Sequence, residues 1–192
     1  MQEIEVKFLN VDPEAIEAKL AAIGARKVGE YFYRRQVFDY PDWRLNADHS
    51  WLRLRDEGDQ ITLSFKKRLG VKADGGNDDG MEETEIIVSD FGKTAELFLR
   101  LGLVNKHYVE NRRRRWQKDG VEFDLDFYPD LEPYLEIEAP SQELVEAAIG
   151  WLGLDPAEQK VFSTNQIYKL KGRSVADYTR ITFEGWVKKD KK

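Results

Sequence analysis

The sequence contains no cysteine and only two histidines, His49 and His107. Without cysteine the chain cannot form a disulfide, a thiolate metal site or a cysteine nucleophile. Two histidines are too few for a histidine-rich zinc site. Any metal site must therefore be built from oxygen ligands, which magnesium, manganese and calcium prefer.

Long apolar runs and an excess of positive charge are also absent. No stretch approaches the roughly 18 apolar residues that a membrane-spanning helix needs, and the first residues lack a basic-then-apolar signal segment. The formal net charge of -6 at pH 7 argues against nucleic-acid binding, because neutralising phosphates requires a basic excess. We expect a cytoplasmic protein with no membrane or nucleic-acid partner.

The chain has 192 residues, of which 41% are hydrophobic and 34% are charged. This length suits one domain with a sizeable core. We predict a domain over residues 1–170 and a polar C-terminal extension over residues 171–192. The Gly- and Asp-rich stretch Gly70–Gly80 is expected to form a mobile loop.

The first predicted strand spans residues 3–8 and alternates between charged and apolar side chains. Because successive side chains of a strand point to opposite faces, Glu3, Glu5 and Lys7 share one face, and the apolar residues share the other. Similar alternation, with polar or charged side chains on one face, recurs in segments 51–55, 60–68, 83–88, 121–128 and 134–138. Two longer strands are predicted at residues 26–40 and 105–117.

Three amphipathic helices are predicted, each between a capping residue and a glycine: Asp12–Gly24, Asp90–Gly102 and Ser141–Gly153. A shorter helix is expected over residues 164–170. The helices need an apolar surface to cover, and the apolar faces of the strands can supply it.

These patterns predict an α+β fold: a closed eight-stranded antiparallel β-barrel with a charged interior, flanked by helices. In this arrangement the apolar strand faces point outward beneath the helices. The alternative is an open sheet that is covered on one face and has a solvated charged face, where ion pairs contribute little. In the closed barrel Lys66 and Glu136 point into the interior, whereas in the open sheet they point to solvent.

A charged interior indicates a charged ligand. Desolvation costs several kcal/mol for each ion that is neither paired nor bound to a ligand. Crowded carboxylates also raise one another's pKa unless a cation lies among them. Arginine and lysine bind phosphate groups, whereas carboxylates bind divalent metals. The pattern therefore predicts a site for a polyanion bridged by a divalent metal.

The segment Glu3-x-Glu5-x-Lys7 resembles the ExExK signature of the CYTH superfamily, the triphosphate tunnel metalloenzymes, which include thiamine triphosphatase, inorganic triphosphatase and class IV adenylate cyclase. Within residues 1–170, further segments match the family in the same order: Phe38–Pro41, Trp51–Arg55, Lys66, Glu83 with Glu85, an arginine-rich strand, Asp124-Leu125-Asp126 and Glu136-x-Glu138. The resemblance implies an eight-stranded tunnel that binds triphosphate with magnesium or manganese.

The resemblance also implies roles for individual residues. On the metal side it places Glu3, Glu5, Asp124, Asp126, Glu136 and Glu138. On the phosphate side it places Lys7, Arg53, Arg55, Lys66, Arg113 and Arg115. Lys66 and Glu5 are the candidate catalytic residues, Lys66 as a group that stabilises the leaving phosphate. Glu83 and Glu85 match the family's acidic fifth strand and are further candidates.

The arginine-rich strand leaves two registers open, because residues 112–115 are four consecutive arginines. Spacing from Trp116 favours Arg113 and Arg115 on the site face. Asn111 stands where the family often has a lysine.

The leading functional hypothesis is a divalent-metal-dependent triphosphatase that hydrolyses a phosphoanhydride bond of tripolyphosphate, a nucleoside triphosphate or thiamine triphosphate. The alternatives are a class IV adenylate cyclase, which makes cyclic AMP from ATP, and a non-catalytic module that binds polyphosphate or a nucleotide. In each case the partner is a small-molecule triphosphate, and the chain is expected to be a monomer or homodimer. The choice between Mg2+ and Mn2+ stays open.

Overall fold

The structure is a computed structural model that describes residues 4–71 and 81–189. Glu3 and residues 72–80 of the predicted loop lie outside the described part. No helix within the described ranges is long and apolar enough to cross a membrane.

The strands and helices follow the predicted segments closely and add several short ones. The strands are β1 (Ile4–Phe8), β2 (Arg26–Asp39), β3 (Ser50–Asp56), β4 (Ile61–Arg68), β5 (Met81–Val88), β6 (Val104–Lys118), β7 (Val121–Phe127), β8 (Tyr134–Ala139), β9 (Tyr178–Thr182) and β10 (Gly185–Lys188). The α-helices are α1 (Pro13–Ala22), α2 (Arg44–Ala47), α3 (Phe91–Arg100), α4 (Gln142–Leu152) and α5 (Thr164–Leu170). Two 3-10 helices are η1 (Pro156–Glu158) and η2 (Val175–Asp177).

The helix starts are set by capping side chains. Asp12 accepts hydrogen bonds from the backbone N–H groups of Glu14 and Ala15, and Pro13 occupies the first turn of α1. Ser163 forms a capping box with Gln166 at the start of α5. The short helix predicted over residues 164–170 is therefore confirmed.

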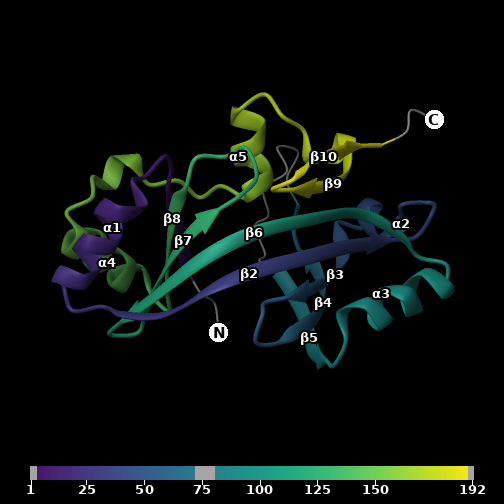
Figure 1. The fold of residues 1–192 in the computed structure, drawn as a ribbon, viewed down its shortest axis with the longest axis horizontal. Coiled ribbons are helices and arrows are strands. Elements are labelled where there is room, and N and C mark those ends of the chain that lie inside the picture. The colour runs from purple at the N-terminus through teal and green to yellow at the C-terminus, as the bar shows by residue number, and fades with distance from the viewer. Residues whose placement is uncertain (1–3, 72–80, 190–192) are drawn as a thin grey trace. The chain divides into compact units, whose positions relative to one another are not determined.

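Within the described part of the chain, the strands form one sheet of ten strands, with the order β1-β8-β7-β6-β2-β3-β4-β5 along its main path. Strand β9 pairs with β10 and also lies parallel to β6. The other pairs with a determined register are antiparallel. Figure 1 shows β2 and β6 as two long neighbouring strands.

The prediction of a closed eight-stranded barrel is wrong. The main path begins at β1 and ends at β5, and hydrogen bonds do not join these two strands within residues 4–71 and 81–189. The helices require only an outward apolar face, and an unclosed sheet provides one equally well. The predicted polar extension supplies two of the ten strands, β9 and β10. It is also partly buried, since Ile181 and Thr182 of β9 are shielded from solvent.

The chain divides into two compact units, which are described separately. Unit 1 comprises residues 1–32 and 111–175, and unit 2 comprises residues 33–110 and 176–192. Strands β2 and β6 each contribute residues to both units.

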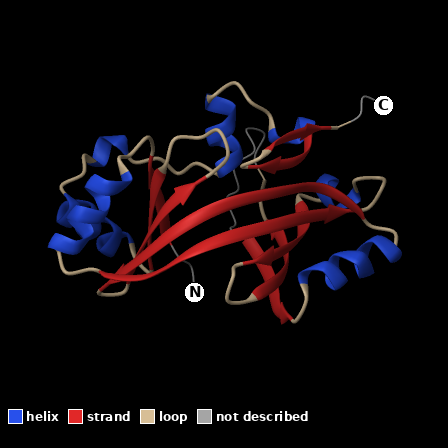
Figure 2. Ribbon diagram, viewed as in Figure 1, coloured by secondary structure: helices blue, strands red, loops and turns tan. Residues whose placement is uncertain are grey.

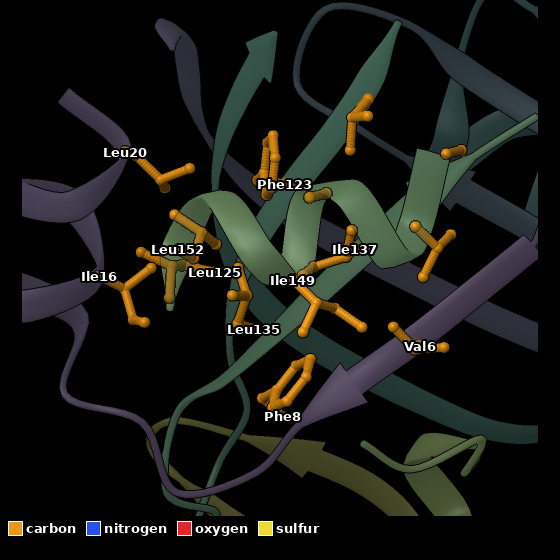
Figure 3. Close-up of a cluster of buried hydrophobic side chains, with 14 residues drawn as sticks. Val6, Phe8, Ile16, Leu20, Phe123, Leu125, Leu135, Ile137, Ile149 and Leu152 are labelled. Atoms are coloured by element: carbon orange, nitrogen blue, oxygen red, sulfur yellow. The ribbon is translucent and has the colours of Figure 1, made fainter. Parts of the chain in front are cut away.

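The core of unit 1 lies between the apolar faces of β1, β7 and β8 and the helices α1 and α4 (Figure 3). Phe123, Leu125, Leu135 and Ile137 of this core are fully buried. Their sequence neighbours on the same strands are mostly charged, so the alternation of the strands places charges on the opposite face. The apolar face that the sequence predicts for these strands therefore packs against α1 and α4.

Unit 2 has a smaller core in which α3 covers one face of its strands (Figure 2). Phe38 and Leu54 are fully buried there, and Phe38 meets Phe98 of α3 edge-on with ring centroids 5.2 Å apart. Here too some of the residues that alternate with the apolar ones carry charge, such as Arg53 and Arg55 on either side of Leu54.

We predict that Ile137→Ala lowers the free energy of unfolding by about 2–5 kcal/mol, because the deleted atoms leave a cavity in the core of unit 1. Ile87→Ala is the matched control, since Ile87 is 71% exposed, and it should change stability by less than about 0.5 kcal/mol. Urea unfolding of the two variants measures both values. Equal losses would contradict the placement of the core.

Candidate functional site

The polar face of unit 1 is built by cross-strand pairing. Lys7 of β1 lies opposite Glu136 of β8, which lies opposite Asp124 of β7, which lies opposite Arg115 of β6. Directly opposed side chains of antiparallel strands are close enough to interact. Two neighbouring carboxylates therefore lie between two cations across four strands.

Arg113 is the centre of this face. Its guanidinium donates to both carboxylate oxygens of Asp126, at 2.9 and 2.5 Å, to Asp124 at 2.5 Å and to Glu136 at 3.2 Å. Asn111, which is fully buried, donates a further hydrogen bond of 3.1 Å to Asp126. One cation thus binds three nearly buried carboxylates.

The pKa values in this cluster follow from burial and from Arg113. Burial raises the pKa of Asp124 and Asp126, and Arg113 opposes the rise. For Glu136, burial also favours the neutral form, but Arg113 and Lys7 outweigh it and lower the pKa. Burial disfavours the charged form of Arg113, yet its carboxylate partners hold its pKa well above the usual value.

The register of the arginine strand matches the one that spacing favours. Arg115 donates to Asp124 at 2.9 and 2.8 Å and contacts Glu122 at 2.7 Å. Arg114 instead bonds to Glu17 of α1 at 2.8 Å, so it points to the opposite face.

Lys7 lies between two carboxylates. Its ammonium group contacts Glu5 and lies 2.9 Å from Glu136, and the residue is only 4% exposed. The backbone of Lys7 also exchanges hydrogen bonds of 2.8 and 2.9 Å with Lys160. Sequence reasoning missed Lys160, because no local pattern relates it to the first strand.

The predicted metal ligands fall into two groups. Asp124, Asp126 and Glu136 are nearly buried and bonded to arginine or lysine. Glu5, which contacts Lys7, and Glu138 lie directly opposite one another on β1 and β8. Within the described residues, no group of three or more acidic or histidine side chains is arranged to hold a metal ion. The predicted ligand Glu3 lies outside that part of the chain.

The polar face of unit 2 carries the other predicted phosphate-binding residues. Arg53 and Arg55 of β3 share a face with Lys66 of β4, and Glu83 and Glu85 of β5 lie on the same face. Lys66 contacts Glu83 at 2.8 Å. Burial, reinforced by Arg53, lowers the pKa of Lys66 in spite of this ion pair.

Arg53 has weaker carboxylate contacts than Arg55 and Lys66 on this face. Its side chain is 17% exposed, and its contacts with Glu85, Glu83 and Ser64 are long, at 3.8, 3.9 and 3.4 Å. Its buried Nε has no hydrogen-bond partner within the described structure. Burial, with help from Arg55 and Arg35, lowers the pKa of Arg53 to about 10.

Two residues of this face were not recognised from the sequence. Glu57, in the turn between β3 and β4, is buried and accepts hydrogen bonds from Arg55 at 2.7 Å and from Thr62 at 3.2 Å. Arg35 of β2 lies directly opposite Arg55 of β3. Its placement depends on the pairing register of two strands, which the local alternation does not determine.

Two tyrosines of β2 contact arginines of the polar faces. Arg55 lies over the ring of Tyr33 at 5.9 Å in unit 2. Arg115 lies over the ring of Tyr31 at 6.0 Å in unit 1.

The fold and these charged faces define an α+β protein with a partly buried polar sheet face. The CYTH domain model matches residues 1–155, and the chain therefore belongs to the CYTH family. The curated protein "Putative adenylate cyclase MJ0240" of Methanocaldococcus jannaschii is 25% identical over 146 residues, which cover 76% of this chain and 81% of that protein.

Two solved structures show the same fold. The PH1012 protein of Pyrococcus horikoshii OT3 is 25% identical with a TM-score of 0.66, covering 86% of this chain and 99% of the other. HpAC1 of Hippeastrum, described as having a dominant triphosphatase activity, is 17% identical with a TM-score of 0.58, covering 92% of this chain and 99% of the other.

We predict that Asp126→Asn lowers the free energy of unfolding by about 3 kcal/mol, because it removes one charge partner from the buried guanidinium of Arg113. Asp130→Asn is the matched control, since Asp130 pairs with Arg173 where both side chains are exposed, and it should cost less than about 1 kcal/mol. Thermal and urea unfolding measure the loss of stability in each variant. A small effect of Asp126→Asn would show that the buried cluster is not needed for stability.

Proposed function

We propose that this CYTH protein is a divalent-metal-dependent triphosphatase, which hydrolyses a phosphoanhydride bond of a small-molecule triphosphate. The proposed substrates are tripolyphosphate, nucleoside triphosphates and thiamine triphosphate. The observation that carries the proposal is Arg53, a largely buried guanidinium with long contacts to carboxylates and a lowered pKa. An anion bound beside Arg53 would supply the charge and the hydrogen-bond acceptors that its surroundings provide only weakly.

The proposed phosphate-binding residues of unit 2 are Arg53, Arg55 and Lys66. Phosphoryl transfer depends mainly on positioning and on neutralising the charge of the phosphate oxygens. Arg55 is held by Glu57, so its guanidinium is oriented before a ligand arrives. Lys66 is proposed as the catalytic residue that stabilises the leaving phosphate. Glu83 contacts Lys66 and approaches Arg53, which suits a role in positioning both.

The cations of unit 1 are proposed as further phosphate-binding residues. Lys7, Arg113 and Arg115 are surrounded by carboxylates, so a phosphate would have to compete with ion pairs already formed. This competition makes them weaker candidates than the cations of unit 2.

The proposed metal is magnesium or manganese. Carboxylate oxygens are the donors that both ions prefer, so the chemistry of the predicted set fits: Glu3, Glu5, Asp124, Asp126, Glu136 and Glu138. Among the described members, Glu5 is the most accessible, with a side chain that is 45% exposed. It is also the second proposed catalytic residue, through the metal it would hold. A bound ion would neutralise charge on the phosphate oxygens during transfer.

A second candidate function is adenylate cyclase activity, because the Methanocaldococcus jannaschii relative carries that name. Both reactions need the same recognition of a triphosphate, and they differ in which phosphorus is attacked. The fold shared with HpAC1, which is described as mainly a triphosphatase, is compatible with hydrolysis.

The products formed from tripolyphosphate, ATP and thiamine triphosphate, each with magnesium or manganese, distinguish the candidates. We expect inorganic phosphate to be released. Cyclic AMP from ATP would identify a cyclase instead. Tight binding without any product would identify a non-catalytic triphosphate-binding module.

We predict that Arg53→Met lowers kcat/KM for the best substrate roughly 100-fold, because it removes a preorganised donor to the phosphate oxygens. Arg100→Met is the matched control, since Arg100 lies on the exposed side of α3 in a pair with Glu96, and its kcat/KM should match that of the unsubstituted protein. Circular dichroism establishes that both variants fold. Unchanged activity of a folded Arg53→Met variant would refute the proposed site.

A further inference from the structure

The C-terminal hairpin of β9 and β10 extends the sheet of unit 2 beyond the region that matches the family. The two strands lie within residues 178–188, whereas the CYTH domain model ends at residue 155. Strand β9 pairs with β6, with Ile181 opposite Val109, and Trp186 of β10 lies opposite Ile181 (Figure 1). Trp186, Ile181 and Val109 therefore share one face of the sheet.

The same face carries the cations of the candidate site. Arg35 of β2 lies directly opposite Arg55 of β3. Burial lowers the pKa of His107 on β6, and nearby positive charges that include Arg35 add to the fall. Val109 shares the face of His107, because it lies two residues further along the strand. One row of side chains thus runs from Trp186 across β6 to the arginines.

The opposite face of these strands has its own contacts, which shows that the alternation of β6 is regular here. Arg180 of β9 lies over the ring of Tyr108 at 4.4 Å, and Tyr108 donates a hydrogen bond of 2.8 Å to Glu110. Asp56 raises the pKa of Arg34, and Tyr108 and Glu110 add to the rise. Even-numbered residues of β6 therefore lie on the face of Arg34, and His107 and Val109 lie on the other.

Two aromatic rings lie together at the hairpin end of the row. Trp186 meets Tyr178 edge-on, with ring centroids 4.8 Å apart and an interplanar angle of 85°. An irregularity in the pairing of β9 and β10 sets Lys188 opposite Tyr178, which brings Tyr178 to the face of Trp186. Both rings and His107 are partly exposed. The face therefore changes from guanidinium groups to accessible aromatic rings, on which a planar base can stack.

Asn105 adds a polar group that a phosphate cannot satisfy. It lies two residues before His107 on the same face of β6. Its buried Oδ1 accepts no hydrogen bond from residues 4–71 or 81–189. Phosphate oxygens are themselves acceptors, whereas heteroaromatic bases carry N–H donors. A buried acceptor without a donor is unfavourable, so this end of the face favours a base as ligand.

The charges near His107 favour a neutral ring. Lys106 donates a hydrogen bond of 2.5 Å to Asn46, and Lys189 lies over the ring of Trp43 at 5.5 Å. After burial, these two lysines contribute most to lowering the pKa of His107 to about 4. A cationic ring, such as the thiazolium of thiamine, would be repelled by them, whereas a purine or pyrimidine base is neutral.

We propose that the C-terminal hairpin selects nucleoside triphosphates, with the base stacked on Trp186 of β10 while the cations of β3 hold the phosphates. This inference rests on the proposed function. Four pairings separate β10 from β3, and strands lie about 4.8 Å apart, so the row spans about 19 Å. An extended nucleoside triphosphate is of comparable length.

The test compares ATP with methyl triphosphate, which has the same phosphate chain but no base. Each is titrated without metal into the unsubstituted protein and into Trp186→Leu, and the heat of binding gives Kd. We expect the unsubstituted protein to bind ATP roughly 10-fold more tightly than methyl triphosphate, as one base–aromatic stack provides. Trp186→Leu should abolish this preference and leave the Kd of methyl triphosphate unchanged.

Val187→Ala is the matched control. Val187 is the next residue of β10, points to the opposite face and is 52% exposed, so this variant should keep the preference for ATP. If Trp186→Leu does not fold, Trp186→Phe takes its place. Its smaller ring should reduce the preference severalfold without abolishing it, and an unchanged preference would contradict the proposal.

The other outcomes are distinct. A preference for ATP that persists in Trp186→Leu, or equal weakening of both ligands, refutes the role of Trp186. Equal Kd values of the unsubstituted protein for ATP and methyl triphosphate refute base selection and leave the proposed function standing. Tighter binding of thiamine triphosphate than of ATP refutes the preference for a neutral ring. If the unsubstituted protein binds none of these ligands and no tripolyphosphate, the proposed function fails together with this inference.

Discussion

The guanidinium of Arg113 is the interaction on which the polar face of unit 1 depends. It binds Asp124, Asp126 and Glu136 from two strands, and all three carboxylates are nearly buried. Buried carboxylates of this kind would be strongly destabilising without a cation. Because Arg113 supplies it, the same strands can bury charge on one face and still present an apolar face to α1 and α4.

In unit 2 the charge balance is the opposite, because a buried cation has too few close carboxylates. Arg53 makes only long contacts with its carboxylate neighbours, and its pKa falls, whereas the carboxylates around Arg113 raise the pKa of that residue. On the polar face of unit 1, carboxylates outnumber cations, so that face favours a cation as ligand. The cations around Arg53 favour an anion. A triphosphate supplies the negative charge that the face of unit 2 favours, and a divalent metal supplies the positive charge that the face of unit 1 favours.

Alternation along the strands was sufficient to predict which side chains share a face. Lys66 and Glu136 are both largely shielded from solvent, as a buried charged face requires, although the sheet is not closed by hydrogen bonds. Whether the sheet closes into a barrel could not be predicted from the sequence, because the helices that cover the sheet constrain only its apolar face. Arg35 and Glu57 escaped prediction because their placement depends on strand register and turn conformation. The roles of the predicted metal and phosphate ligands stay predictions.

The most direct test of the central claim is the nitrogen-15 NMR signal of the Arg53 Nε–H group during titration with tripolyphosphate in the absence of metal. An Arg53→Lys variant assigns the signal. This Nε has no hydrogen-bond partner within the described structure, so a phosphate acceptor should shift its resonance strongly and slow its exchange with water. Saturable binding of tripolyphosphate that leaves the Arg53 signal unchanged would contradict the account.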